Sequence, residues 1–349
     1  MQLIYHPAGS DELLRGAVSD LQTGRWLATR DLLAQTGQNW ALRTSRSQVL
    51  AVAAAPSGVV EAWLREEPNH PDALMMRARV AVERALRAHR HQHDMTAQLE
   101  RDAREAAQVA ARCSPKDPVP WVCLVALAQA DVRQLRPEHH VKPREPMLPF
   151  GPWTLVDEVT ARDPKGNREA FHRLLHLLRE QSVSLGAMLD FGQWVASWAS
   201  AGSPLLLLPL YAQAEQSRRH SALSGRADPL WRQYWTHEPV RMHALRAFEF
   251  WFRTVDPRWC SVADLSHLAY ALWAGNQQVE AAHVFTAMGP YGSTSPWSSL
   301  RIDDGPEGTG EALLLKARRE SLGFARRAGP AVPKPEPSPA LRLGMPLPE

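Results

Sequence analysis

The chain has 349 residues and a net charge of only +3, so its charge gives little reason to expect a nucleic-acid partner. Hydrophobic residues make up 44% and charged residues 22% of the sequence, which is an ordinary globular composition with enough material for a sizeable core. The three cysteines form no C-x-x-C pair, and an odd count suits a reduced compartment better than a disulfide framework.

The chain start lacks the basic region and following apolar stretch of a signal peptide. The most apolar run, Leu205 to Tyr211, is too short to cross a bilayer and contains Pro209. We therefore expect a cytoplasmic protein with no membrane partner.

One turn recurs along the chain: an apolar helical stretch ends at a proline, and a new apolar stretch starts about six residues later. It is clearest from Leu64 to Leu74 and returns around Pro115, Pro164 and Pro257. The spacing implies a unit of roughly 47 residues, longer than the tetratricopeptide repeat of about 34. Four or five such units fill the first 290 residues with stacked helix pairs.

The spacing of apolar residues predicts a chain of helices with little strand. A first helix is capped by Ser10 and ends before Gly24, and another segment restarts at Ser203-Pro204. The other predicted helices cover residues 26–35, 57–67, 74–88, 96–112, 121–132, 154–162, 168–180, 185–199, 229–235, 240–254, 261–273, 278–288 and 311–327. In the helix over 261–273, Ser261 and Asp264 resemble a capping box.

Two segments depart from this pattern. Residues 136–153 hold five prolines and no helical period, which predicts a long loop within a helical-repeat domain spanning residues 1–328. Residues 329–349 are rich in proline and lack a core-forming pattern, so they are predicted to form a disordered tail.

Several segments carry a resemblance to known repeats. Gly24-Arg-Trp26 matches the Gly and aromatic of a tetratricopeptide repeat, as does the hydrophobic spacing of Leu265, Leu268, Ala269, Leu272, Ala281, Phe285 and Met288. Residues 159–167, 201–204 and 209–215 resemble a tetratricopeptide-like family of unknown function common in actinobacteria, over about residues 50–290. The resemblance implies an all-α superhelix of stacked antiparallel helical hairpins with irregular repeats, and it implies no activity.

Chemical motifs are scarce. His172 and His176 lie four residues apart on a predicted helix and could face one metal ion, but no third ligand is evident. Core packing or a surface position is the preferred interpretation, and we expect no metal or cofactor. No phosphate-binding loop of the G-x-x-x-x-G-K-[ST] type and no G-x-S-x-G motif occurs, so no catalytic residue is predicted.

The preferred functional hypothesis is a non-catalytic scaffold that binds a partner protein along a concave helical groove. Arg77 and Arg84, on the most basic helix, are the candidate binding residues. The alternative is an enzyme or small-ligand-binding helical domain whose site is assembled from distant residues. A deep pocket with two or more buried ionisable side chains would favour this alternative.

Overall fold

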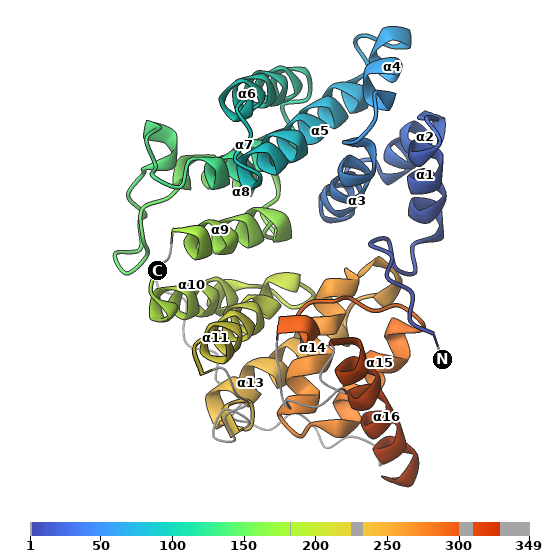
Figure 1. The fold of residues 1–349 in the computed structure, drawn as a ribbon, viewed down its shortest axis with the longest axis vertical. Helices are drawn as coiled ribbons and strands as arrows, with labels where there is room; N and C mark the ends of the chain where they lie inside the picture. Colours follow the sequence, from blue (N-terminus) through green and yellow to red (C-terminus); the bar gives the residue numbers. More distant parts are fainter. Residues whose placement is uncertain (1, 182, 225–232, 300–309, 329–349) are drawn as a thin grey trace.

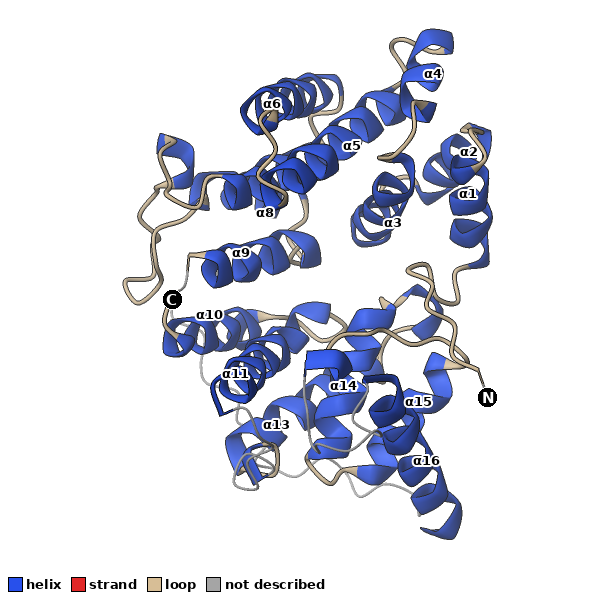
Figure 2. Ribbon diagram, in the orientation of Figure 1, coloured by secondary structure: helices blue, strands red, loops and turns tan. Residues whose placement is uncertain are grey.

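The computed structural model describes residues 2–181, 183–224, 233–299 and 310–328, which form helices joined by loops (Figure 1, Figure 2). Within these residues, β structure is limited to two isolated bridges, Ile4–Tyr291 and Val141–Gly151. The predicted all-α class is confirmed. The predicted tail at 329–349 and most of the predicted helix at 229–235 lie outside the described residues.

Most consecutive helices contact each other, and the helices from α1 to α9 lie in one half of the molecule while the later ones lie in the other (Figure 1). The first half contains α1 (Glu12–Gln22), α2 (Leu27–Thr36), α3 (Trp40–Ala54), α4 (Val59–Glu66), α5 (Pro71–Arg90), α6 (Thr96–Cys113), α7 (Val119–Leu127), α8 (Trp153–Arg162) and α9 (Arg168–Glu180). The second half contains α10 (Leu185–Trp198), α11 (Leu208–Ser224), α13 (Glu238–Ala247), α14 (Val262–Ala274), α15 (Gln278–Met288) and α16 (Gly310–Ala328). Short turns of tighter helix include Pro204–Leu207 before α11 and Pro257–Trp259 before α14.

Polar caps fix where several helices begin. Asp11 caps α1 by accepting a hydrogen bond from the backbone N–H of Leu14 at 3.0 Å, so the prediction of Ser10 as the cap was one residue early. Asn167 caps α9 in the same way through the N–H of Ala170 at 3.2 Å. Such caps typically stabilise a helix by about 1 kcal/mol because they satisfy an otherwise free N–H group.

Helix α3 lies in a stretch for which the sequence pattern predicts no helix. Its buried face carries Arg43, Thr44, Arg46 and Ser47 beside Leu50 and Ala51, so polar side chains interrupt the apolar stripe. A helix whose buried side is partly charged gives a weak hydrophobic period, although its backbone is regular.

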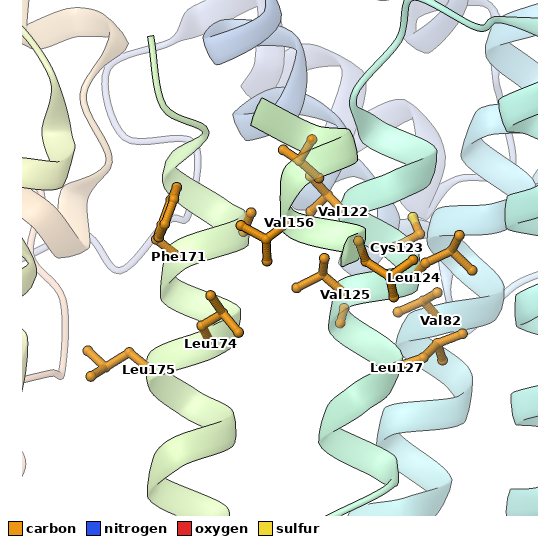
Figure 3. Packing of buried hydrophobic residues seen from close by; sticks show 14 of the residues in the cluster. Val82, Val122, Cys123, Leu124, Val125, Leu127, Val156, Phe171, Leu174 and Leu175 are labelled. Atoms are coloured by element: carbon orange, nitrogen blue, oxygen red, sulfur yellow. The ribbon is translucent and has the colours of Figure 1, made fainter. Parts of the chain in front are cut away.

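The central core forms around α7, on which eight of nine residues are buried. In Figure 3, Leu127 of α7 lies beside Val82 of α5, whereas Val125 points toward α9, where Leu174 lies. Separate clusters fill the N-terminal helices and the C-terminal helices. The described helices therefore bury their apolar faces in three clusters that follow one another along the chain.

The two ends of the helical array are tied together. The N–H of Ile4 donates to the carbonyl of Pro290 at 2.9 Å, and the N–H of Gly292 donates to the carbonyl of Ile4 at 3.1 Å. Leu3 is buried in the C-terminal cluster, and the guanidinium of Arg15 lies 5.5 Å from the ring centre of Tyr291. The array is thus closed by its own N-terminal segment.

The predicted loop at 136–153 is irregular and is anchored by a few buried residues. Residues Pro137–His139 form one turn of helix, and the Val141–Gly151 bridge closes the loop at its base. His139 is buried, with its Nδ1 at 2.9 Å from Asp131 Oδ2.

In the described part of the chain no single helix is long and apolar enough to cross a membrane. Helices α3 and α4 reach the required length and apolar character only as a pair, and that pair is bent by 109°.

Candidate functional site

A cavity of about 360 Å³ lies where α9, α10, α11 and α14 meet. Its volume falls in the range of small-molecule sites, about 300–1,000 Å³. The residues that line it are His172, Leu175, His176, Arg179, Met188, Tyr211, Ala214, Glu215, Arg218, His267, Ser295 and Pro296. We call this space the histidine cavity.

A buried triangle of polar side chains supports one wall of the cavity. Arg168 on α9 donates to both carboxylate oxygens of Asp264 on α14, at 2.5 and 2.6 Å. The hydroxyl of Tyr211 on α11 donates to the same carboxylate at 2.6 Å. Burial and the negative charge of Asp264 raise the pKa of Tyr211 well above its ordinary value, so this phenol stays protonated. Three helices are thereby held in one geometry.

Two histidine rings pack on the ring of Tyr211. His267 of α14 stacks on it with ring centres 3.6 Å apart, and His172 of α9 meets it edge-on at 4.4 Å. Burial lowers the pKa of His267 to about 4, so this ring is neutral at pH 7. Burial, together with the charge of Arg168, also lowers the pKa of His172 well below its ordinary value.

The ring nitrogens of the two histidines differ in their hydrogen bonding. The Nδ1 atom of His267 lies 2.8 Å from the carbonyl oxygen of Ala263, and because a carbonyl only accepts, Nδ1 carries the proton. In a neutral ring, Nε2 of His267 is then a hydrogen-bond acceptor. The Nε2 atom of His172 is buried and has no hydrogen-bond partner among the described residues.

The mouth of the cavity is rich in guanidinium groups. Glu215 accepts hydrogen bonds from Arg218 at 2.6 and 2.7 Å and from Arg219 at 2.9 Å. Although burial opposes it, these bonds and the nearby charge of Arg179 lower the pKa of Glu215. Arg179 also pairs with Glu180 at 2.9 Å. Of these side chains, Arg179, Arg218 and Glu215 line the cavity, so two positive groups face one carboxylate there.

The structure places the predicted histidine pair at this cavity. His172 lies inside with its Nε2 atom buried, and His176 is exposed at the rim one turn later. No group of three His, Cys, Asp or Glu side chains arranged to hold a metal ion occurs within the described ranges. The pair is better suited to hydrogen bonding than to coordination.

Arg77 and Arg84, the predicted binding residues, lie on α5 and do not line the cavity. Arg77 is exposed. Arg84 is half-buried, donates to the carbonyls of Ala55 at 2.9 Å and Ser57 at 2.6 Å, and pairs with Glu61. Arg84 therefore holds the turn between α3 and α4 and is not a free surface anchor.

Other inner-face arginines are also used inside the protein. Arg79 on α5 pairs with Glu169 on α9 at 2.7 Å, and both side chains are only 3% exposed. Arg46 on α3 pairs with Asp11 at 2.9 Å, and Arg173 pairs with Glu83 at 2.8 Å. These three arginines therefore join segments that are distant in the sequence.

One partial signal for the site is visible in the sequence, namely the His172–His176 spacing. Tyr211 and His267 stand on other helices, so only the fold brings them together. Asp264 resembled part of a capping box, but Ser261 makes no side-chain cap, and the carboxylate binds Arg168 and Tyr211.

Comparison with known protein families, with curated proteins and with solved structures finds no match to this chain. The helical packing is compatible with a helical-repeat fold. The function must therefore be argued from the site itself.

Proposed function

We propose that this helical-repeat protein binds a small molecule in the histidine cavity. The supporting observation is a cavity of about 360 Å³ whose wall contains His267, with Nε2 left as a hydrogen-bond acceptor, beside the apolar side chains of Leu175 and Met188. Convergent polar groups within a partly apolar pocket are typical of ligand sites.

The proton affinities favour binding over acid–base catalysis. A catalytic acid or base works best when its pKa is near the operating pH. Burial lowers the pKa of His267 to about 4 and raises the pKa of Tyr211 well above its ordinary value. Neither group therefore changes its protonation state near pH 7. Both groups are fixed in neutral forms that suit recognition.

A fragment screen with a blocked variant tests this proposal. Ligand-observed NMR on the whole protein should find small fragments that also raise the melting temperature. The substitution Ala214→Leu adds bulk to a buried residue of the cavity wall and should abolish binding, whereas Arg77→Gln, on exposed α5 surface, should not. Binding that persists in a folded Ala214→Leu protein, or no binding at all, would contradict the proposal.

A second candidate function is attachment to a partner protein, as the repeat resemblance suggests. The observation in its favour is the loop between α7 and α8, which exposes Leu135, Met147 and Phe150 by 80%, 61% and 43%. Exposed apolar side chains gathered on one ordered segment often mark an interaction site. Arg77, exposed on α5, remains the candidate charged contact in this hypothesis.

Affinity capture from the native cell extract distinguishes this second candidate. The double substitution Leu135→Asp and Met147→Asp should release a partner that uses the loop, and Arg77→Glu should release one that uses α5. Circular dichroism must show that each variant is folded. Full retention of every captured protein by both variants would exclude these two surfaces.

A further inference from the structure

We infer that the ligand of the histidine cavity is a compact organic anion that also carries a hydrogen-bond donor. This inference rests on the proposed function and specifies its ligand class. Three features of the cavity carry it: an acceptor nitrogen in its wall, an excess of guanidinium groups at its mouth, and apolar side chains between them.

The requirement for a donor follows from the tautomer of His267. Its Nδ1–H is committed to the carbonyl of Ala263 at 2.8 Å, which leaves Nε2 as an acceptor on a residue that lines the cavity. A ligand hydroxyl or N–H group therefore has a fixed acceptor on His267.

The preference for an anion follows from the charges at the mouth. Glu215 is bound by Arg218 and Arg219 and also feels the charge of Arg179, so one carboxylate is surrounded by three cations. Glu180 offsets only part of the excess through its pair with Arg179 at 2.9 Å. A carboxylate or phosphate on the ligand would complete the charge balance, and guanidinium groups bind such anions through paired hydrogen bonds.

Apolar side chains form part of the cavity wall. Leu175, Met188 and Ala214 are buried and line the cavity. A volume of about 360 Å³ is suited to a single ring or a short chain. The ligand is thus amphipathic, with an apolar middle, an anionic end near Arg179 and Arg218, and a donor near His267.

Three commercially available probes separate these requirements. 4-Hydroxybenzoate has both a carboxylate and a phenol donor, benzoate lacks the donor, and 4-hydroxybenzamide lacks the charge. We expect 4-hydroxybenzoate to bind at least about tenfold more tightly than either of the other two, because each of them leaves one polar group of the site unpaired. Titration calorimetry or ligand-observed NMR on the full chain measures the ratios.

Two substitutions assign the effects to residues. His267→Phe keeps a ring against Tyr211 but removes the acceptor, so 4-hydroxybenzoate should fall to the affinity of benzoate while benzoate is unchanged. Arg179→Gln should weaken both acids several-fold and leave 4-hydroxybenzamide unaffected. Arg77→Gln, on α5 away from the cavity, is the matched arginine control and should change none of the three.

The outcomes are separable. Equal binding of benzoate and 4-hydroxybenzoate overturns the donor requirement, and equal binding of the amide and the acid overturns the anion requirement. If none of the three probes binds while other fragments bind and are lost in Ala214→Leu, the ligand class is wrong and the proposed function stands. If no fragment binds at all, the proposed function itself fails.

Discussion

Asp264 shows how one carboxylate can fix the relative positions of three helices. Its side chain is only 2% exposed, and it accepts hydrogen bonds from Arg168 on α9 and Tyr211 on α11. A buried ion pair is not by itself strongly stabilising, because both charges lose water. Removing one partner, however, leaves the other charge buried and unpaired, which is costly.

We therefore predict that Asp264→Asn lowers the free energy of unfolding by about 3–5 kcal/mol, since Arg168 would keep its charge without a partner. Urea unfolding followed by circular dichroism measures the change. The control is Asp31→Asn, which removes the carboxylate of an exposed pair with Arg30 and should have little effect. A loss from Asp264→Asn no larger than that from the control would contradict the assigned role.

The histidines of the cavity make stability depend on pH. An unfolded histidine has a pKa near 6.5, whereas that of folded His267 is about 4 and that of His172 is also lowered. Between these values the unfolded chain binds protons that the folded chain does not. The free energy of unfolding therefore falls as the pH drops from about 6.5 toward 4, by up to about 3 kcal/mol from His267 alone.

Urea unfolding at pH 7, 6 and 5 tests this prediction, in a window above most carboxylate titrations. Other buried histidines contribute to the total slope, so the informative comparison is with His267→Phe. That variant should lose less stability between pH 7 and pH 5 than the natural chain. Parallel slopes for the two proteins would show that His267 is not protonated on unfolding.

At the scale of single elements, the sequence predicts helices well where caps and an apolar period agree. Helix α9 begins after the Asn167 cap and has a buried apolar face, and its predicted bounds match the structure. Helix α3 was missed because arginines replace apolar residues on its buried side. The histidine cavity could not be predicted, since His172, Tyr211 and His267 come from three helices whose mutual orientation depends on the whole stack.

The Asn167 cap joins elements as well as starting one. Its Oδ1 accepts from the N–H of Ala170, and its Nδ2 donates to Thr44 on α3 at 3.1 Å and to Asp163 at 3.0 Å. We predict that Asn167→Ala costs about 2–3 kcal/mol, more than a simple cap, because Thr44 and Asp163 lose a buried partner. Ser184→Ala, at the exposed cap of α10, is the control and should cost about 1 kcal/mol or less. Equal losses in chemical denaturation would count against a joining role.

At the scale of the whole molecule, the N-terminal segment ties the first helix to the last ones. We predict that Leu3→Asp, which places a charge in the C-terminal cluster, detaches this segment without unfolding the hairpins, because each hairpin packs mainly on its neighbours. Hydrogen exchange followed by mass spectrometry should then speed up around residues 3–5 and 290–292. Ile4→Thr, which changes an exposed side chain of the same segment and keeps the backbone bridge, is the control and should leave exchange slow.

This tie also determines how the protein responds to force. An open stack of helical hairpins can lengthen under tension, because each unit can rotate slightly on the next and the small rotations add up along the stack. Here the bridge between Ile4 and Tyr291 joins the two ends of the helical array. Tension applied between α1 and α15 would act first on this bridge. The hairpins could extend only after the bridge opens. We therefore expect the two ends of the helical array to stay together until this bridge opens.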